Sequence, residues 1–293
     1  MTIQWFPGHM AKARRQVEEK LNQVDLVMEL LDARLPLSSR NPLIDELVGR
    51  RPRIVLLTKS DLADPDRNQE WLRYFKDQGT PALLIDAQAG TGVNEILPLA
   101  RELLQTKIVA QRKKGIRSSR MRGMILGIPN VGKSSLINRL AKRSAAKTGD
   151  RPGITRSEQW IRVGTLELLD TPGILWPKFD DPIVGLRLAA SGAIKEELLP
   201  TEEVALYLLD HLLSHYPQSY IDRYGSFPKG EGLLLLEQVG RKRGCMQRGG
   251  TVDLERAAEV LLRDFRTGKL GRISLERPED WEKEQADAST RDH

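Results

Sequence analysis

The sequence contains a single cysteine, Cys245, among its 293 residues. One thiol cannot form a disulfide within the chain, and no group of metal-binding residues accompanies it. A disulfide-stabilised fold and a cysteine-based metal centre are therefore excluded. This use of cysteine is typical of proteins in a reducing compartment.

Long apolar runs are also missing. No segment approaches the roughly 18 consecutive apolar residues that a membrane-spanning helix needs. The opening stretch MTIQWFPGHMAKARR carries basic residues but lacks the hydrophobic region of a secretion signal. We therefore expect a cytoplasmic protein that does not span a membrane.

Positive charge is in excess and unevenly distributed. The chain has 46 lysines and arginines against 40 aspartates and glutamates, a net charge of +6. This uneven distribution favours a polyanionic partner, with nucleic acid as the leading candidate, although a single basic run is more often a solvated face. The three basic stretches contain Lys12, Arg14 and Arg15; Arg112, Lys113, Lys114, Arg117, Arg120 and Arg122; and Arg241, Lys242, Arg243 and Arg248.

Apolar runs alternate with helical patterns in the first third of the chain. The segments VDLVMELLDARLP, RIVLLTKSDL and PALLIDAQAG predict buried strands, and DRNQEWLRYFKDQG between the last two predicts a helix. This alternation indicates an α/β fold with a parallel-rich sheet flanked by helices. The helical pattern of GVNEILPLARELLQTKI should pack on that sheet, and the basic segment KIVAQRKKGIRSSRMRG that comes next predicts a linker.

Further strands are expected in QWIRVG and LELLD, and amphipathic helices dominate from Thr201 onward. We therefore expect an α/β domain over residues 1–195, a smaller all-α domain over residues 196–285 and a polar tail over residues 286–293.

The segment GIPNVGKS, from Gly127 to Ser134, has the phosphate-loop pattern between an apolar strand and a helix. Its backbone N–H groups and the helix N-terminus suit the phosphates of a nucleotide. Lys133 is expected to reach the β and γ phosphates, and the Ser134 hydroxyl to ligate Mg²⁺. The expected nucleotide contacts here are Asn130, Val131, Gly132, Lys133, Ser134 and Ser135.

The stretch LELLDTPG ends a strand at Asp170, whose carboxylate can hold Mg²⁺. Gly173 can donate its backbone N–H to the γ phosphate. Between the two motifs, Thr155 lies in a polar, turn-rich segment and can close over Mg²⁺ when a γ phosphate is present. A plain surface loop without a switch threonine is the alternative for that segment.

The strand that predicts base recognition comes first in the chain and ends in TKSD. Asp61 can accept hydrogen bonds from N1–H and the exocyclic amine of guanine, which adenine cannot donate, and the stem of Lys59 can lie over the base. GTP is therefore expected rather than ATP. The Thr58 hydroxyl can tie this loop to the phosphate loop. Asp86 and Ala87, in DAQAG, are the expected second base contact.

The motif order TKSD, DAQAG, GIPNVGKS, PGIT, DTPG resembles that of the circularly permuted GTPases. The strings QWFPGHMAKARR, DARLP, KTGDRPGITR and DTPGILWPKF are similar to those of the bacterial members that act in ribosome biogenesis. The resemblance implies a P-loop GTPase domain of permuted order, because cutting a domain at a surface connection and joining its old termini preserves the sheet. It also implies K⁺ held by Asn130.

The position after DTPG carries Ile174, where many GTPases have a glutamine that orients water. Ile174 cannot do so, and hydrolysis by the chain alone is expected to be slow. The expected catalytic residues are Lys133 and His9. For His9, a role at the start of a helix or in contact with RNA is an equal alternative.

The resemblance implies a partner, the precursor of the large ribosomal subunit, bound in the GTP state and released after hydrolysis. The chain is expected to be monomeric. One alternative is a nucleotide-gated RNA-binding scaffold in which hydrolysis is incidental. Another is a P-loop ATPase or kinase, although Asp61, which suits guanine, counts against it. Trp5, Phe6 and Trp176 either stack on bases or pack in the protein.

Overall fold

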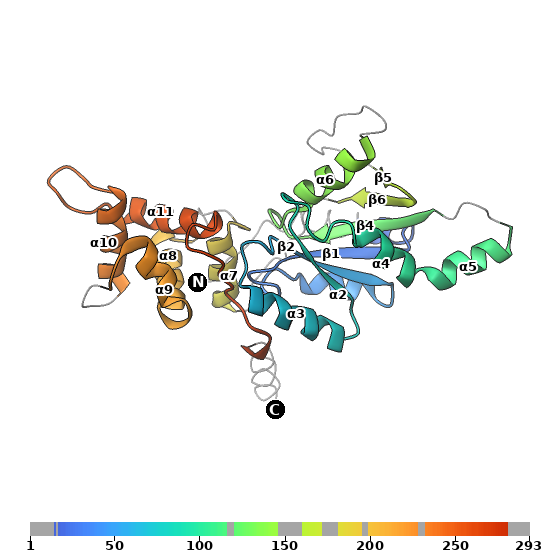
Figure 1. Cartoon of the computed structure of the whole chain (residues 1–293), viewed down its shortest axis with the longest axis horizontal. Coiled ribbons are helices and arrows are strands. Elements are labelled where there is room, and N and C mark those ends of the chain that lie inside the picture. Colours follow the sequence, from blue (N-terminus) through green and yellow to red (C-terminus); the bar gives the residue numbers. More distant parts are fainter. Residues whose placement is uncertain are drawn as a thin grey trace.

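A computed structural model of the chain describes Arg15 and residues 17–115, 120–145, 160–171, 181–194, 199–227 and 232–280. Within these residues, the fold divides into a sheet with flanking helices and a separate group of helices (Figure 1). We call the first part the sheet domain, which contains β1 to β6 and α2 to α6. We call α7 to α11 the helical module.

The sheet domain is built on a parallel sheet, as the sequence predicts. The described strands form one sheet of six in the order β3-β2-β1-β4-β6-β5, in which only the β5–β6 pair is antiparallel. The strands are β1 (Leu26–Asp32), β2 (Arg53–Thr58), β3 (Ala82–Ile85), β4 (Met121–Gly127), β5 (Trp160–Val163) and β6 (Leu166–Asp170).

Both faces of the sheet are covered, which explains why all seven residues of β1 are buried. On one face, Leu31 and Leu57 pack with Trp71 of α3 (Pro65–Asp77). The helix α2 (Pro42–Val48) covers the same side through Ile44 and Val48. On the other face, β1 residues such as Met28 share a core with α4 (Ile96–Leu103) and α6 (Lys133–Ala145).

The prediction of a linker from Lys107 is wrong for its first part. The helix α5 runs over Gln105–Lys113 and projects away from the sheet (Figure 1). The segment has no glycine or proline before Gly115, and lysine, glutamine, arginine and alanine are good helix formers. Its polarity therefore indicated exposure rather than the absence of a helix.

The helical module confirms the prediction of helices from Thr201. In α11, a buried side that includes Leu261 and Phe265 packs against α7, α8 and α10. None of the described helices is long and apolar enough to cross a membrane. The helices are α7 (Pro182–Ser191), α8 (Thr201–His215), α9 (Pro217–Tyr224), α10 (Gly232–Arg243) and α11 (Leu254–Arg266).

The division between domains near residue 195 stays a prediction. The helix α7 precedes that position but packs against α8 and α11, which follow it. For this reason we describe α7 with the helical module.

The segment after α11 returns to the sheet domain and binds along it. The backbone N–H of Ile273 donates to the Leu62 carbonyl (3.0 Å), and that of Leu275 donates to the Arg34 carbonyl (2.7 Å). The carboxylate of Glu276, which is buried, accepts from the N–H groups of Leu37 (2.8 Å) and Ser38 (2.9 Å). Since buried N–H groups need acceptors, Glu276 fixes the loop after β1 to the end of the helical module.

We expect Glu276→Ala to lower the free energy of unfolding by about 2 kcal/mol or more, because two buried N–H groups lose their acceptor. Thermal and denaturant unfolding measure this change. The matched control is Glu279→Ala, at an exposed position, which should be close to neutral. Equal stability of the two variants would contradict the assigned role of Glu276.

Candidate nucleotide site

The predicted site residues come directly after parallel strands, so the strands deliver them to one edge of the sheet. The strands β2, β4 and β6 end at Thr58, Gly127 and Asp170. In the ladders, Thr58 is paired with Asp32 of β1, and Asp170 with Ile125 of β4. Loops that are far apart in the chain therefore lie side by side.

The phosphate loop has the predicted strand, loop and helix context. Residues 128–132 join β4 to α6, which begins at Lys133. Asn130 has φ of 56° and Gly132 has φ of 107°, and this positive range favours glycine. The loop therefore curls at the N-terminus of α6, where backbone N–H groups and the helix dipole suit an anion. Ser134 and Ser135 are exposed on the first turn.

The Lys133 side chain folds back over its own loop. Its ammonium donates to the carbonyls of Gly127 (2.8 Å) and Ile128 (2.6 Å), and the residue is buried. Burial lowers the pKa of Lys133 to about 8, against the opposing effect of Asp170, whose carboxylate favours the charged form. A phosphate bound at this loop would place negative charge beside the Lys133 ammonium and so favour its charged form.

Two of the residues predicted to hold Mg²⁺ are described, and both carry oxygen atoms. Ser134 is exposed at the start of α6, and the buried Asp170 ends β6 and acts to raise the pKa of Lys133. A hydroxyl and a carboxylate suit Mg²⁺, which takes its other ligands from water and phosphate oxygens. No group of three potential acidic, histidine or cysteine ligands occurs in the described residues.

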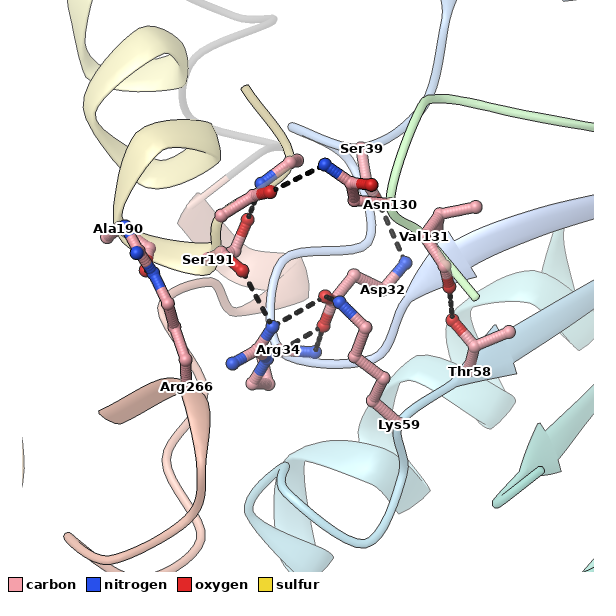
Figure 2. Close-up of polar contacts among 12 residues, drawn as sticks. Asp32, Arg34, Ser39, Thr58, Lys59, Asn130, Val131, Ala190, Ser191 and Arg266 are labelled. Carbon is pink, nitrogen blue, oxygen red and sulfur yellow. Dashed lines mark hydrogen bonds and ion pairs between the residues drawn. The ribbon is translucent and has the colours of Figure 1, made fainter. Parts of the chain in front are cut away.

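Thr58 joins the loop after β2, which carries TKSD and which we call the base loop, to the phosphate loop. Its hydroxyl lies 2.5 Å from the Val131 carbonyl and 3.0 Å from the Leu31 carbonyl, and the side chain is buried (Figure 2). Gly132 lies against Thr58, and its φ of 107° rather than lack of space favours glycine there, because a Cβ would stand in ordinary contact at 3.6 Å from the Cβ of Thr58. The hydroxyl thus connects the end of β2 with the phosphate loop, through two residues that are 73 positions apart in the chain.

The other two predicted base contacts, Asp61 and Asp86, carry charges that interact. Burial raises the pKa of Asp61, and the Asp86 carboxylate raises it further. Asp86 itself accepts from the backbone N–H groups of Gln88 (2.8 Å) and Ala89 (3.0 Å). Its carboxylate therefore shapes the turn, and Ala87 packs against the main core.

Sequence reasoning missed two buried charges at this edge. Asp32 and Arg34 are 2% and 1% exposed and form a two-pronged ion pair, Nε to Oδ1 at 2.9 Å and Nη2 to Oδ2 at 2.8 Å. The ammonium of Lys59 also bonds to Asp32 Oδ2 (2.9 Å). Burial acts to raise the pKa of Asp32, but Arg34 and Lys59 together hold it well below its ordinary value. The signal in the sequence was the pair of charges directly after an apolar strand.

The last carbonyls of α7 accept hydrogen bonds from side chains at this edge. Asn130 Nδ2 donates to the Gly192 carbonyl (3.1 Å), and Arg34 Nη2 donates to the Ser191 carbonyl (3.4 Å). Arg266 of α11 donates to the Ala189 and Ala190 carbonyls (2.7 and 2.9 Å). These groups cap the helix end and connect the phosphate loop with the helical module (Figure 2).

Several predicted residues lie outside the described residues. These are His9, Thr155, Gly173 and Ile174. Their roles stay predictions.

A doubly covered, mostly parallel sheet, in which the TKSD segment precedes the phosphate loop along the chain, is the architecture of a P-loop GTPase domain of circularly permuted order. The comparisons agree with this class. A family model described as 50S ribosome-binding GTPase matches residues 122–225.

Relatives and solved structures extend the likeness over almost the whole chain. Ribosome biogenesis GTPase A of Priestia megaterium is 56% identical, over 96% of this chain and 99% of its own. Mitochondrial ribosome-associated GTPase 1 of Mus musculus is 35% identical, over 93% and 90%. GDP-bound YlqF covers 90% of this chain and all of its own at a TM-score of 0.66 and 27% identity. The chain belongs to the family of ribosome biogenesis GTPase A.

We expect Thr58→Val to weaken GDP binding by roughly tenfold, because the isosteric side chain leaves the Val131 and Leu31 carbonyls without their shared donor and loosens the phosphate loop. Calorimetric titration with GDP measures the affinity. Thr58→Ser keeps the hydroxyl and should bind like the wild type. If Thr58→Val binds GDP equally well, the hydroxyl does not hold the two loops together.

Proton uptake tests the state of Lys133. With its pKa at about 8, Lys133 should be about half protonated at pH 8, and bound phosphates favour the charged form. Binding of GDP should therefore take up about half a proton at pH 8, much less at pH 7, and affinity should fall as the pH rises further. Titration in buffers of different ionisation enthalpy measures the uptake, and its absence at pH 8 would be incompatible with a neutralised lysine.

Proposed function

We propose that the chain binds GTP with Mg²⁺ at this edge of the sheet, hydrolyses it, and acts in late assembly of the large ribosomal subunit. It binds the subunit precursor in the GTP state and leaves after hydrolysis. The observation that carries the proposal is the convergence of the TKSD and GIPNVGKS loops, joined by Thr58 and Val131, at one sheet edge of a ribosome biogenesis GTPase.

In this site, the phosphate loop holds the phosphates through its backbone and Lys133, and Ser134 and Asp170 hold Mg²⁺. Thr155 and Gly173 complete the contacts to Mg²⁺ and the γ phosphate. Asp61 recognises guanine, Lys59 covers the base, and the turn shaped by Asp86 presents backbone N–H groups near Ala87.

The catalytic step lacks a water-orienting glutamine, so charge stabilisation has to come from elsewhere. We propose K⁺ at Asn130 as one source. Since its amide nitrogen donates to Gly192, the amide oxygen points to the opposite side, where a cation can bind it. His9 is the second source, as an acid or base near the phosphates. Turnover is slow for the chain alone and rises when the ribosomal subunit completes the site.

Exposed basic residues supply the contacts to rRNA. The last turn of α10 presents Arg241, Lys242 and Arg243, all exposed. At the start of β4, Arg122 lies over the ring of the exposed Trp160, 5.2 Å from its centroid. Both sites suit phosphates, and the second also offers a surface for a base. We further propose a cytoplasmic monomer.

A nucleotide-gated scaffold remains the second candidate because Ile174 cannot orient water. In that case, GTP would control RNA binding through the contacts between the phosphate loop and α7, and hydrolysis would be incidental.

Turnover of GTP by the full chain separates these candidates. We expect purified large subunits to raise the rate at least tenfold in K⁺ buffer and much less in Na⁺ buffer, because K⁺ replaces a catalytic side chain and the subunit orders the site. Tight GTP-dependent binding without stimulation would favour the scaffold. Stimulation that is equal in the two buffers would remove K⁺ from the mechanism.

A further inference from the structure

The base-recognition loop depends on residues outside its own motif. We propose that Asp32 is a positioning residue that holds Lys59 in place for the guanine base, and that Arg34 fixes Asp32 from the junction with the helical module. This inference rests on the proposed GTP binding and concerns a part of the site that the nucleotide-binding motifs do not include. Figure 2 shows the three side chains converging.

The conformational freedom of Lys59 is restricted at its backbone and at its ammonium group. Its backbone has φ of 55°, a left-handed conformation that is uncommon for residues other than glycine. Its ammonium lies 2.9 Å from Asp32 Oδ2, and 26% of its side chain stays exposed. The aliphatic stem therefore runs between the loop after β2 and the Asp32 carboxylate. A stem held in this way can contact a base while its charge stays on Asp32.

Asp32 is in turn prevented from moving. Its two carboxylate oxygens accept from Arg34 Nε and Nη2, and Oδ1 also accepts from the Arg34 backbone N–H at 3.1 Å. The Asp32 backbone N–H lies 2.9 Å from the Ser39 hydroxyl. A carboxylate with three donors from one residue has a single orientation, and its remaining acceptor capacity points to Lys59.

Arg34 belongs to the junction between the two parts of the molecule. Its guanidinium lies over the Phe265 ring of α11, 4.9 Å from the centroid, and reaches the Ser191 carbonyl at the end of α7. Its own carbonyl accepts from Leu275. Since Arg can form a two-pronged pair and stack at once, it transmits the position of these helices to Asp32.

A Lys59 side chain that is already ordered before binding should raise nucleotide affinity, because a mobile side chain loses conformational entropy when the nucleotide fixes it. The ordinary alternative is a structural ion pair that only holds the two parts together. The two differ in a measurable way: a positioning pair changes guanine nucleotide affinity through Lys59, whereas a structural pair changes stability alone.

The experiment uses the full chain with GDP and IDP as probes, for Asp32→Asn, Lys59→Met and the double variant. We expect Asp32→Asn to lower the affinities for GDP and IDP by the same factor, about three- to tenfold. The GDP to IDP ratio should stay constant, because IDP lacks only the amine that Asp61 recognises. In the double variant, Asp32→Asn should add less than about twofold to the effect of Lys59→Met.

The matched control is Glu29→Gln, on the same strand as Asp32. Glu29 is also fully buried and is paired with Arg53 at 3.1 Å, and it lies three residues before Asp32, so that its side chain points to the opposite face of the sheet. This variant should lower the melting temperature and leave GDP affinity within about twofold of the wild type. An Asp32→Asn variant that behaves like Glu29→Gln overturns the proposal, as does full additivity with Lys59→Met.

A second variant covers the case in which Asp32→Asn does not fold. Arg34→Lys keeps a positive charge beside Asp32 but loses the two-pronged contact. This variant should bind GDP and IDP more weakly than the wild type by the same factor. Wild-type affinity would overturn the proposal. If the wild type binds neither nucleotide, the proposed function fails instead, and the two failures are distinguishable.

Discussion

The buried ion pair of Asp32 and Arg34 lies where the sheet edge, the base loop and the helical module meet. A buried charge pair is stabilising only when its remaining donors and acceptors are used, so its surroundings have to fit it closely. Lys59, directly after β2, donates to Asp32, and the Ser191 carbonyl of α7 accepts from Arg34. Phe265 of α11 lies against the guanidinium, whose Nη1 has no hydrogen-bond partner among the described residues. The pair is therefore one of the contacts that hold the base loop relative to the helical module, beside the bond from Ile273 to the Leu62 carbonyl.

The permuted chain order has little effect on the site, because a parallel sheet places loops by strand position. β1 lies between β2 and β4, and the loops after all three strands meet at the same edge. The bond between Thr58 and Val131 joins residues that the permutation has separated in the chain. The permuted order does bring α7 soon after β6, and the last carbonyls of that helix contact Asn130 and Arg34.

The sequence predicted the strands, the phosphate loop and the Thr58 contact because each has a local pattern: an apolar run, a glycine motif, a hydroxyl after a strand. It did not predict α5, because a basic helix without an apolar stripe resembles a linker. It also did not predict the bonds from Glu276 to Leu37 and Ser38, which join positions about 240 residues apart. No periodic pattern records such contacts, and the burial of Arg34 is likewise visible only when the helical module is in place.

Competition between GDP and ADP for the full chain tests most directly whether the loops after β2 and β4 form a guanine nucleotide site. GDP is predicted to displace a fluorescent GDP analogue. ADP at roughly a hundredfold higher concentration is predicted not to do so, because adenine leaves the Asp61 carboxylate without donors. Equal displacement by the two nucleotides would contradict the account, since phosphate binding alone would then explain the affinity.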